Sequence, residues 1–81
     1  MSKRTYYFDE QGIKAFGNKL REIRLMKGYS QERLANEAGL PSSQISRIET
    51  GKINTSLSHI CLLARVLEVR LKDLMDFELE D

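Results

Sequence analysis

Apolar positions in the centre of the chain recur at the spacing of an α-helix. Leu34, Ala35 and Ala38 form one small apolar face, because residues three and four apart lie on the same side of a helix. Ser30 precedes this face and is suited to cap the helix, since its hydroxyl can accept a backbone N–H that has no partner at a helix start. Gly39 ends the helix, because a residue without a Cβ adopts the left-handed conformation at little cost.

A second short helix is predicted from Ser42 to about Thr50. Ile45 and Ile48 point inward from it, and Ser43 and Arg47 lie on the opposite face. This outer face carries hydroxyls and a guanidinium but no acid, whereas an ordinary solvated face mixes Glu and Lys. Side chains of this kind match base edges and phosphates, so DNA recognition is one interpretation of the pattern and a solvated helix face is the other.

Three further apolar stripes predict helices on either side of this pair. Each stripe repeats at helical spacing, so the chain is expected to be all-α with five helices. The stripes are Phe16, Leu20 and Ile23 within 13–27; Leu57, Ile60, Leu63 or Ala64, and Leu67 in a helix that Thr55 or Ser56 caps; and Leu71, Leu74 and Met75 within 69–77.

The central pair of helices resembles the helix-turn-helix of the phage repressor and Cro (XRE-type) family, which includes the small controller proteins of restriction-modification systems. The resemblance runs from about Phe16 to about Phe77. It implies a compact, five-helix, lambda-repressor-like DNA-binding domain whose recognition helix, about 42–50, enters the major groove. The matching residues are Ser30-Gln31, Leu34-Ala35, Gly39, Ile45-Ser46, Ile48-Glu49 and Gly51.

The resemblance also implies which residues meet double-stranded DNA. Arg47 is the best candidate for a bidentate contact to guanine. The two serines of the helix are short and can make few direct contacts to bases, so DNA shape is expected to contribute to specificity. For Asn54 a role in the turn is the alternative to a DNA contact. The expected DNA-binding residues are Gln31 on a phosphate; Ser42, Ser43 and Arg47 on base edges; Gln44 on bases or phosphate; and Lys52 and Asn54 on phosphates.

Two structural roles follow from the same resemblance. Arg24 is expected to pair with Glu49 at the end of the recognition helix, an ion pair that fixes the arrangement of the helices more reliably than it adds stability.

Arg70 occupies the place where the family has Ser, Thr or Asp as the cap of the last helix, so that helix is expected to fray or to be held by a partner chain. The last helix often forms the dimer contact, with packing inside the monomer as the alternative. The candidate dimer residues are Leu74, Phe77 and Leu79.

Composition and charge bound the picture. Eighty-one residues with 41% hydrophobic and 7% aromatic content make one small helical domain. The net charge of +1 at first argues against nucleic-acid binding. However, residues 1–27 carry +4 and residues 68–81 carry −4, which suggests that the C-terminal tail is kept away from an anionic partner. We expect no membrane span and no signal peptide, and therefore a cytoplasmic protein.

The domain organisation is predicted as an N-terminal arm at 1–12, a helix-turn-helix domain at 13–77 and an acidic tail at 78–81. The arm carries Lys3, Arg4 and the aromatic cluster 6–8. It is expected either to touch DNA or, more simply, to form a loosely packed terminus.

No catalytic constellation is visible, so the protein is not expected to be an enzyme. His59 and Cys61 have no partner at metal-ligand spacing, and neither a metal, a cofactor nor a small-molecule ligand is expected. The predicted function is a transcriptional regulator that binds a pseudo-palindromic operator as a homodimer. An antitoxin or restriction-modification controller with the same fold, and a protein-interaction module that does not bind DNA, remain as alternatives.

Overall fold

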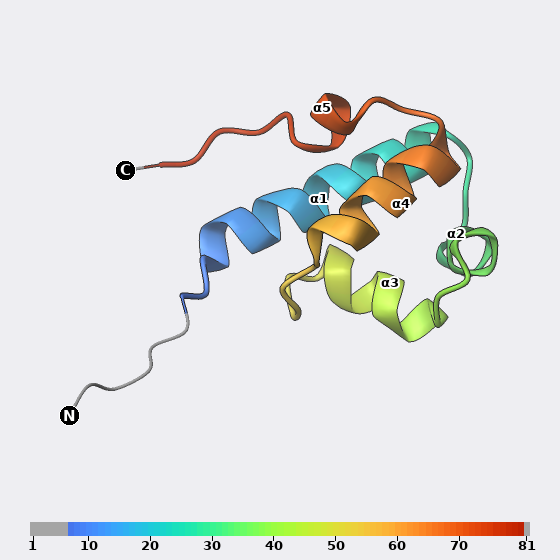
Figure 1. Cartoon of the computed structure of the whole chain (residues 1–81), viewed down its shortest axis with the longest axis horizontal. Helices are drawn as coiled ribbons and strands as arrows, with labels where there is room; N and C mark the ends of the chain where they lie inside the picture. The colour runs from blue at the N-terminus through green and yellow to red at the C-terminus, as the bar shows by residue number, and fades with distance from the viewer. Residues whose placement is uncertain (1–6, 81) are drawn as a thin grey trace.

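The computed structural model describes residues 7–80, and these contain five helices and no strand, which confirms the expected all-α fold (Figure 1). The interior between the helices is filled by aliphatic side chains and one phenylalanine. The helices are α1 (Glu10–Met26), α2 (Gln31–Ala38), α3 (Ser42–Glu49), α4 (Leu57–Leu67) and α5 (Leu71–Leu74). The buried core consists of Phe16, Leu20, Ile23, Leu34, Ala35, Ile45, Ile48, Leu63, Ala64, Leu67 and Leu74.

Side-chain caps set where three of the helices begin. Asp9, Ser30 and Ser56 each accept the backbone N–H three residues later, at 2.9–3.1 Å. Because Asp9 caps α1, that helix starts at Glu10 and not at Ile13, so the predicted boundary of the arm at residue 12 was wrong. Residues 1–6 of the predicted arm, with Lys3 and Arg4, lie outside the described residues.

The last helix is shorter than the predicted span 69–77, and its N-cap residue, Arg70, makes no side-chain cap hydrogen bond. Arg70 has no acceptor side chain, and the carboxylate of Asp73 instead accepts the Arg70 backbone N–H at 3.0 Å. This hydrogen bond lowers the pKa of Asp73, since it favours the charged carboxylate. Arg70 thus supplies no capping side chain, as expected, and the Asp73 carboxylate contributes a different hydrogen bond at the start of α5.

Leu74 is fully buried inside the chain and cannot contact a partner. Its assignment as a dimer residue was wrong, and the alternative of packing within the monomer holds for it. Beyond α5 the chain runs back beside α1 (Figure 1), where the backbone N–H of Glu80 donates to Gln11 Oε1 at 2.8 Å. The segment expected to be a solvated acidic tail is thus attached to α1 at this residue.

Gly17 is a buried glycine where α1 crosses the end of α3. A Cβ at this position would collide with the backbone carbonyl oxygen of Ile48 and would lie 3.0 Å from that of Glu49. The two helices therefore meet main chain to main chain. This close approach fixes the C-terminal end of α3 against α1.

Candidate functional site

A buried hydrogen-bond network connects the ends of the first three helices. Arg24 Nε lies 2.6 Å from Glu49 Oε2, and Arg24 Nη2 donates to Glu49 Oε1 at 3.1 Å. The same guanidinium donates through Nη1 to the backbone carbonyl of Tyr29 at 2.7 Å. Gln31 Nε2 completes the network by donating to Glu49 Oε1 at 3.0 Å. The network thus fixes the start of α2 and the end of α3 against α1.

The Arg24–Glu49 pair is almost completely removed from water, with 6% of each residue exposed. Bidentate geometry and the additional partners satisfy both groups, and no buried side-chain nitrogen or oxygen among residues 7–80 lacks a hydrogen-bond partner. Desolvation offsets much of the attraction within such a pair. Its main effect is therefore to allow one arrangement of the two helices.

Gln31 is positioned by the network and still has a free donor. Its amide nitrogen carries two hydrogens, and one of them is used by Glu49. The residue stands at the first position of α2, where backbone N–H groups of the first turn have no partner within the helix. A phosphate at this point would find both the amide and the positive end of the helix.

The outer face of α3 is exposed and contains no acidic group. Ser42, Ser43 and Arg47 all project into solvent, whereas Ile45 and Ile48 on the opposite face are fully buried. None of the ion pairs among the described residues involves Arg47. Its guanidinium therefore keeps its full set of donors for a ligand.

Gln44 does not belong to this outer face. It is half-buried, and its Nε2 lies 3.2 Å from His59 Nδ1 on α4. The pairing occurs because Gln44 lies on the flank of α3 that is turned toward α4. Sequence reasoning placed Gln44 on DNA and gave His59 no partner, since two side chains fifteen positions apart carry no mutual signal in one sequence.

The loop between α3 and α4 contains two exposed polar side chains. Lys52 and Asn54 are exposed, and the turn depends on Gly51, which has φ +72°. The side chain of Lys14, from α1, lies directly against this glycine. Lys14 was not among the residues expected from the sequence, since helical periodicity shows only that it is exposed.

The guanidinium of Arg33, on α2, is engaged by two neighbouring side chains. The Arg33 guanidinium lies 3.9 Å from the centre of the Tyr29 ring, and its Nε lies 2.9 Å from Glu37 Oε2. The Tyr29 hydroxyl donates to Glu37 Oε1 at 3.1 Å. The hydrogen bond from Arg33 lowers the pKa of Glu37, so the pair is ionised at neutral pH. Arg33 is therefore largely neutralised by its own neighbours.

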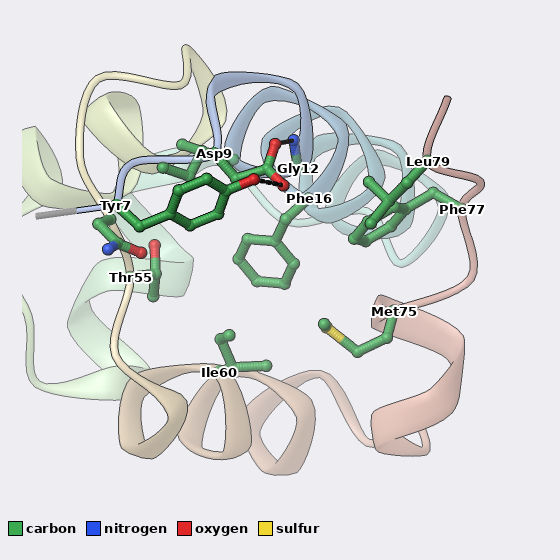
Figure 2. A pocket seen from close by; sticks show the side chains of 11 residues that line it. Tyr7, Asp9, Gly12, Phe16, Thr55, Ile60, Met75, Phe77 and Leu79 are labelled. Carbon is green, nitrogen blue, oxygen red and sulfur yellow. Dashed lines mark hydrogen bonds between the residues drawn. The ribbon is translucent and has the colours of Figure 1, made fainter. Parts of the chain in front are cut away.

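A cavity of about 320 Å³ opens between α1, the α3–α4 loop, α4 and the C-terminal segment (Figure 2). Its walls are mainly apolar and include Ile60, Met75, Phe77 and Leu79, with Thr55 of the loop at one side. Met75 and Leu79 are 43% and 55% exposed. The cavity thus joins an exposed apolar surface to the loop that follows α3.

In the part of the chain that the structure describes, no helix is both long and apolar enough to span a membrane. No cluster of three or more His, Cys, Asp or Glu in residues 7–80 is arranged to hold a metal ion.

Comparison with known proteins finds similar chains. Residues 20–74 match the sequence profile of a family described as helix-turn-helix. The control protein C.BamHI of Bacillus amyloliquefaciens is 49% identical over 63 residues, covering 76% of this chain and 78% of that protein. Among solved structures, the restriction-modification controller protein C.AhdI from Aeromonas hydrophila is 42% identical, with a TM-score of 0.74 over 76% of this chain and 94% of that one. The controller protein C.Esp1396I, solved as a tetramer in complex with its natural 35-base-pair operator, is 26% identical, with a TM-score of 0.72 over 84% of this chain and 100% of that one.

Proposed function

The chain belongs to the helix-turn-helix family, and on that basis we propose that it is a sequence-specific DNA-binding transcriptional regulator that binds a pseudo-palindromic operator as a homodimer. The observation that carries the proposal is the buried network of Arg24, Glu49 and Gln31. It holds α2 and α3 in one arrangement and leaves the acid-free face of α3 in solvent. The role involves no catalysis, and it is carried out in the cytoplasm.

In the proposed complex α3 enters the major groove, and its N-terminal half and Arg47 face the base pairs. Arg47 binds a guanine through two hydrogen bonds, and Ser42 and Ser43 make shorter contacts to base edges. Gln31, Lys52 and Asn54 lie on either side and bind phosphates, which sets the register of the helix in the groove. Gln44 is expected to reach bases or phosphate from the flank of α3, through the part of its amide that His59 does not engage.

A homodimer doubles the binding surface, which compensates for the small area and low net charge of one chain. The apolar surface around the cavity suits the contact between the two copies, because Met75 and Leu79 are exposed there and Phe77 is half-buried (Figure 2). Thr55 of the α3–α4 loop borders the same cavity. A partner docked there would therefore lie next to the loop that binds DNA.

The controller role in a restriction-modification system is the specific form of regulation that we favour. The chain is 49% identical to the control protein C.BamHI, and its fold matches that of C.AhdI over nearly the whole of that chain. An antitoxin would use the same binding face. The two roles are distinguished by the genes beside the coding sequence, since a controller is expected next to a restriction enzyme and a methyltransferase.

The experiment that tests the proposal is selection of binding sites from a random duplex pool, followed by sequencing of the bound fraction. Enrichment of an inverted repeat, with half-sites about one helical turn apart, is the expected result. Weak binding without enrichment that disappears at moderate salt would contradict the proposal and favour a protein-interaction module.

A further inference from the structure

Lys14 and Gly51 form a contact between α1 and the loop that follows the recognition helix. A Cβ at Gly51 would lie 2.6 Å from Lys14 Cγ and 3.3 Å from Lys14 Cα. The lysine stem therefore crosses the space that only a glycine leaves open. Gly51 has a second reason to be glycine, since its φ of +72° lies in the left-handed region. One residue thus provides both the turn of the loop and the position of Lys14.

The charge of Lys14 is available, in contrast to that of two other cations on the same helix, Lys19 and Arg24. Lys19 pairs with Glu22 at 3.2 Å, and Arg24 is engaged by Glu49. Lys14 is exposed, and none of the ion pairs within residues 7–80 includes it. The lysine stem rests on the glycine directly before Lys52, which is also exposed and in none of these ion pairs, so α1 and the loop bring two chain positions that carry such lysines close together.

From this geometry we infer that Lys14 is a further phosphate-binding residue, which extends the DNA-binding surface from the α3–α4 loop onto α1. The inference rests on the proposed function, because the loop follows the DNA backbone only if α3 occupies a groove. A flexible lysine is suited to this role, since it binds a phosphate as a point charge without a strict geometry. Lys14 therefore contributes affinity on any sequence and does not select bases.

The test uses Lys14→Met, which keeps the aliphatic stem over Gly51 and removes the charge. The affinity of the 81-residue chain for its selected operator is measured by fluorescence anisotropy across a range of salt concentrations. Each phosphate contact contributes about 0.9 to the slope of log affinity against log salt, and the homodimer carries two copies of Lys14, so the slope of Lys14→Met is expected to fall in magnitude by about 1.8 per dimer. The affinity should fall by the same factor on the operator and on an unrelated duplex, and the selected sequence should not change.

Two further variants separate charge from packing. Lys14→Arg retains the charge and is expected to keep the slope of the parent chain. Lys19→Met removes a cation from the same helix that is already paired with Glu22, and it too should keep that slope. Thermal unfolding of each variant establishes that the comparison is made between folded proteins, and Lys14→Gln replaces Lys14→Met if the latter does not fold.

The outcomes distinguish this inference from the function on which it rests. If the parent chain selects an operator but removal of the Lys14 charge leaves affinity and slope unchanged, Lys14 does not bind phosphate and the inference is wrong. If the loss is confined to the operator, Lys14 reads bases and the assignment to phosphate is wrong. If the parent chain selects no sequence, the proposed function fails and this inference with it.

Discussion

The carboxylate of Glu49, at the end of α3, accepts two hydrogen bonds from the guanidinium of Arg24, at the end of α1, at 2.6 and 3.1 Å. The two residues are 25 positions apart in the chain and are equally buried. Because Gln31 joins them from the start of α2, the relative placement of three helices depends on one carboxylate.

Removal of one partner of this pair is expected to destabilise the fold strongly. Glu49→Leu leaves the Arg24 guanidinium buried without its counter-charge, and such a change costs about 3–5 kcal/mol of the free energy of unfolding. Arg24→Met together with Glu49→Leu should cost much less, because no charge is then left unpaired. Urea unfolding of the two variants measures the difference, and equal losses would contradict this account of the pair.

Gly17→Ala is expected to destabilise the protein because the added methyl group collides with the Ile48 carbonyl oxygen. Overpacking of this kind typically costs about 1–3 kcal/mol. Gly12→Ala on the same helix is the matched control, since a Cβ there would lie 3.4 Å from Asp9 Cγ, an ordinary contact. The control should be neutral or slightly stabilising. If thermal unfolding shows the same loss of stability in both variants, the α1–α3 contact is not the cause.

Arg47→Ala is expected to lower the preference for the selected operator by about 1–3 kcal/mol per half-site, which is the discrimination supplied by a bidentate contact to guanine. Arg33→Ala removes a cation from the neighbouring helix that Glu37 already neutralises, and should change the preference little. Competition binding against duplexes with single base-pair changes identifies the base involved. A uniform loss on all duplexes would instead place Arg47 on a phosphate.

Asp73 is expected to make stability depend on pH at the acid end. Because its pKa in the folded chain is lowered below the ordinary value of 3.8, its ionised form contributes stability above that pH. The contribution is lost as the pH falls through the lower, folded value. Asp73→Asn keeps an acceptor for the Arg70 N–H and removes the charge, so it should be less stable than the parent at pH 7. Denaturant unfolding at several pH values should show this difference shrinking below pH 3.8.

Leu79→Glu is expected to weaken the homodimer, because it places a charge on the exposed apolar surface around the cavity. Met26→Glu is the control, since Met26 is 75% exposed and ends α1, away from the helix start that borders the cavity (Figures 1 and 2). Sedimentation equilibrium across a range of concentrations measures the association of each variant. Unchanged association of Leu79→Glu would place the dimer contact on another surface.

The periodic features of the fold were predictable from the sequence, whereas features that depend on contacts between distant residues were not. The stripes of α1 and α4 and the Gly39 turn follow from local spacing and local backbone preference. The early start of α1 depends on Asp9, a cap that precedes the apolar stripe and so lies outside the periodic signal. The burial of Leu74 could not be separated from a dimer role, because both roles require an apolar side chain.

The candidate site follows the same division. The exposure of Ser43 and Arg47 follows from the inward direction of Ile45 and Ile48, which periodicity gives directly. The engagement of Gln44 by His59 and the contact of Lys14 with Gly51 require knowledge of how α3 and its loop lie against α4 and α1. Neither pairing has a local pattern in a single sequence.

The main-chain contact at Gly17 has a consequence for how this protein could acquire new specificity. Side chains do not set the spacing between α1 and α3 at that point, since the carbonyl of Ile48 rests directly on the glycine. The height and angle of α3 are therefore insensitive to which residues stand on its outer face. In the proposed complex, substitutions at Ser42, Ser43 and Arg47 would change the DNA sequence that is bound while the position of α3 stays the same. The outer face of α3 can therefore vary in sequence, whereas the α1–α3 contact at Gly17 cannot.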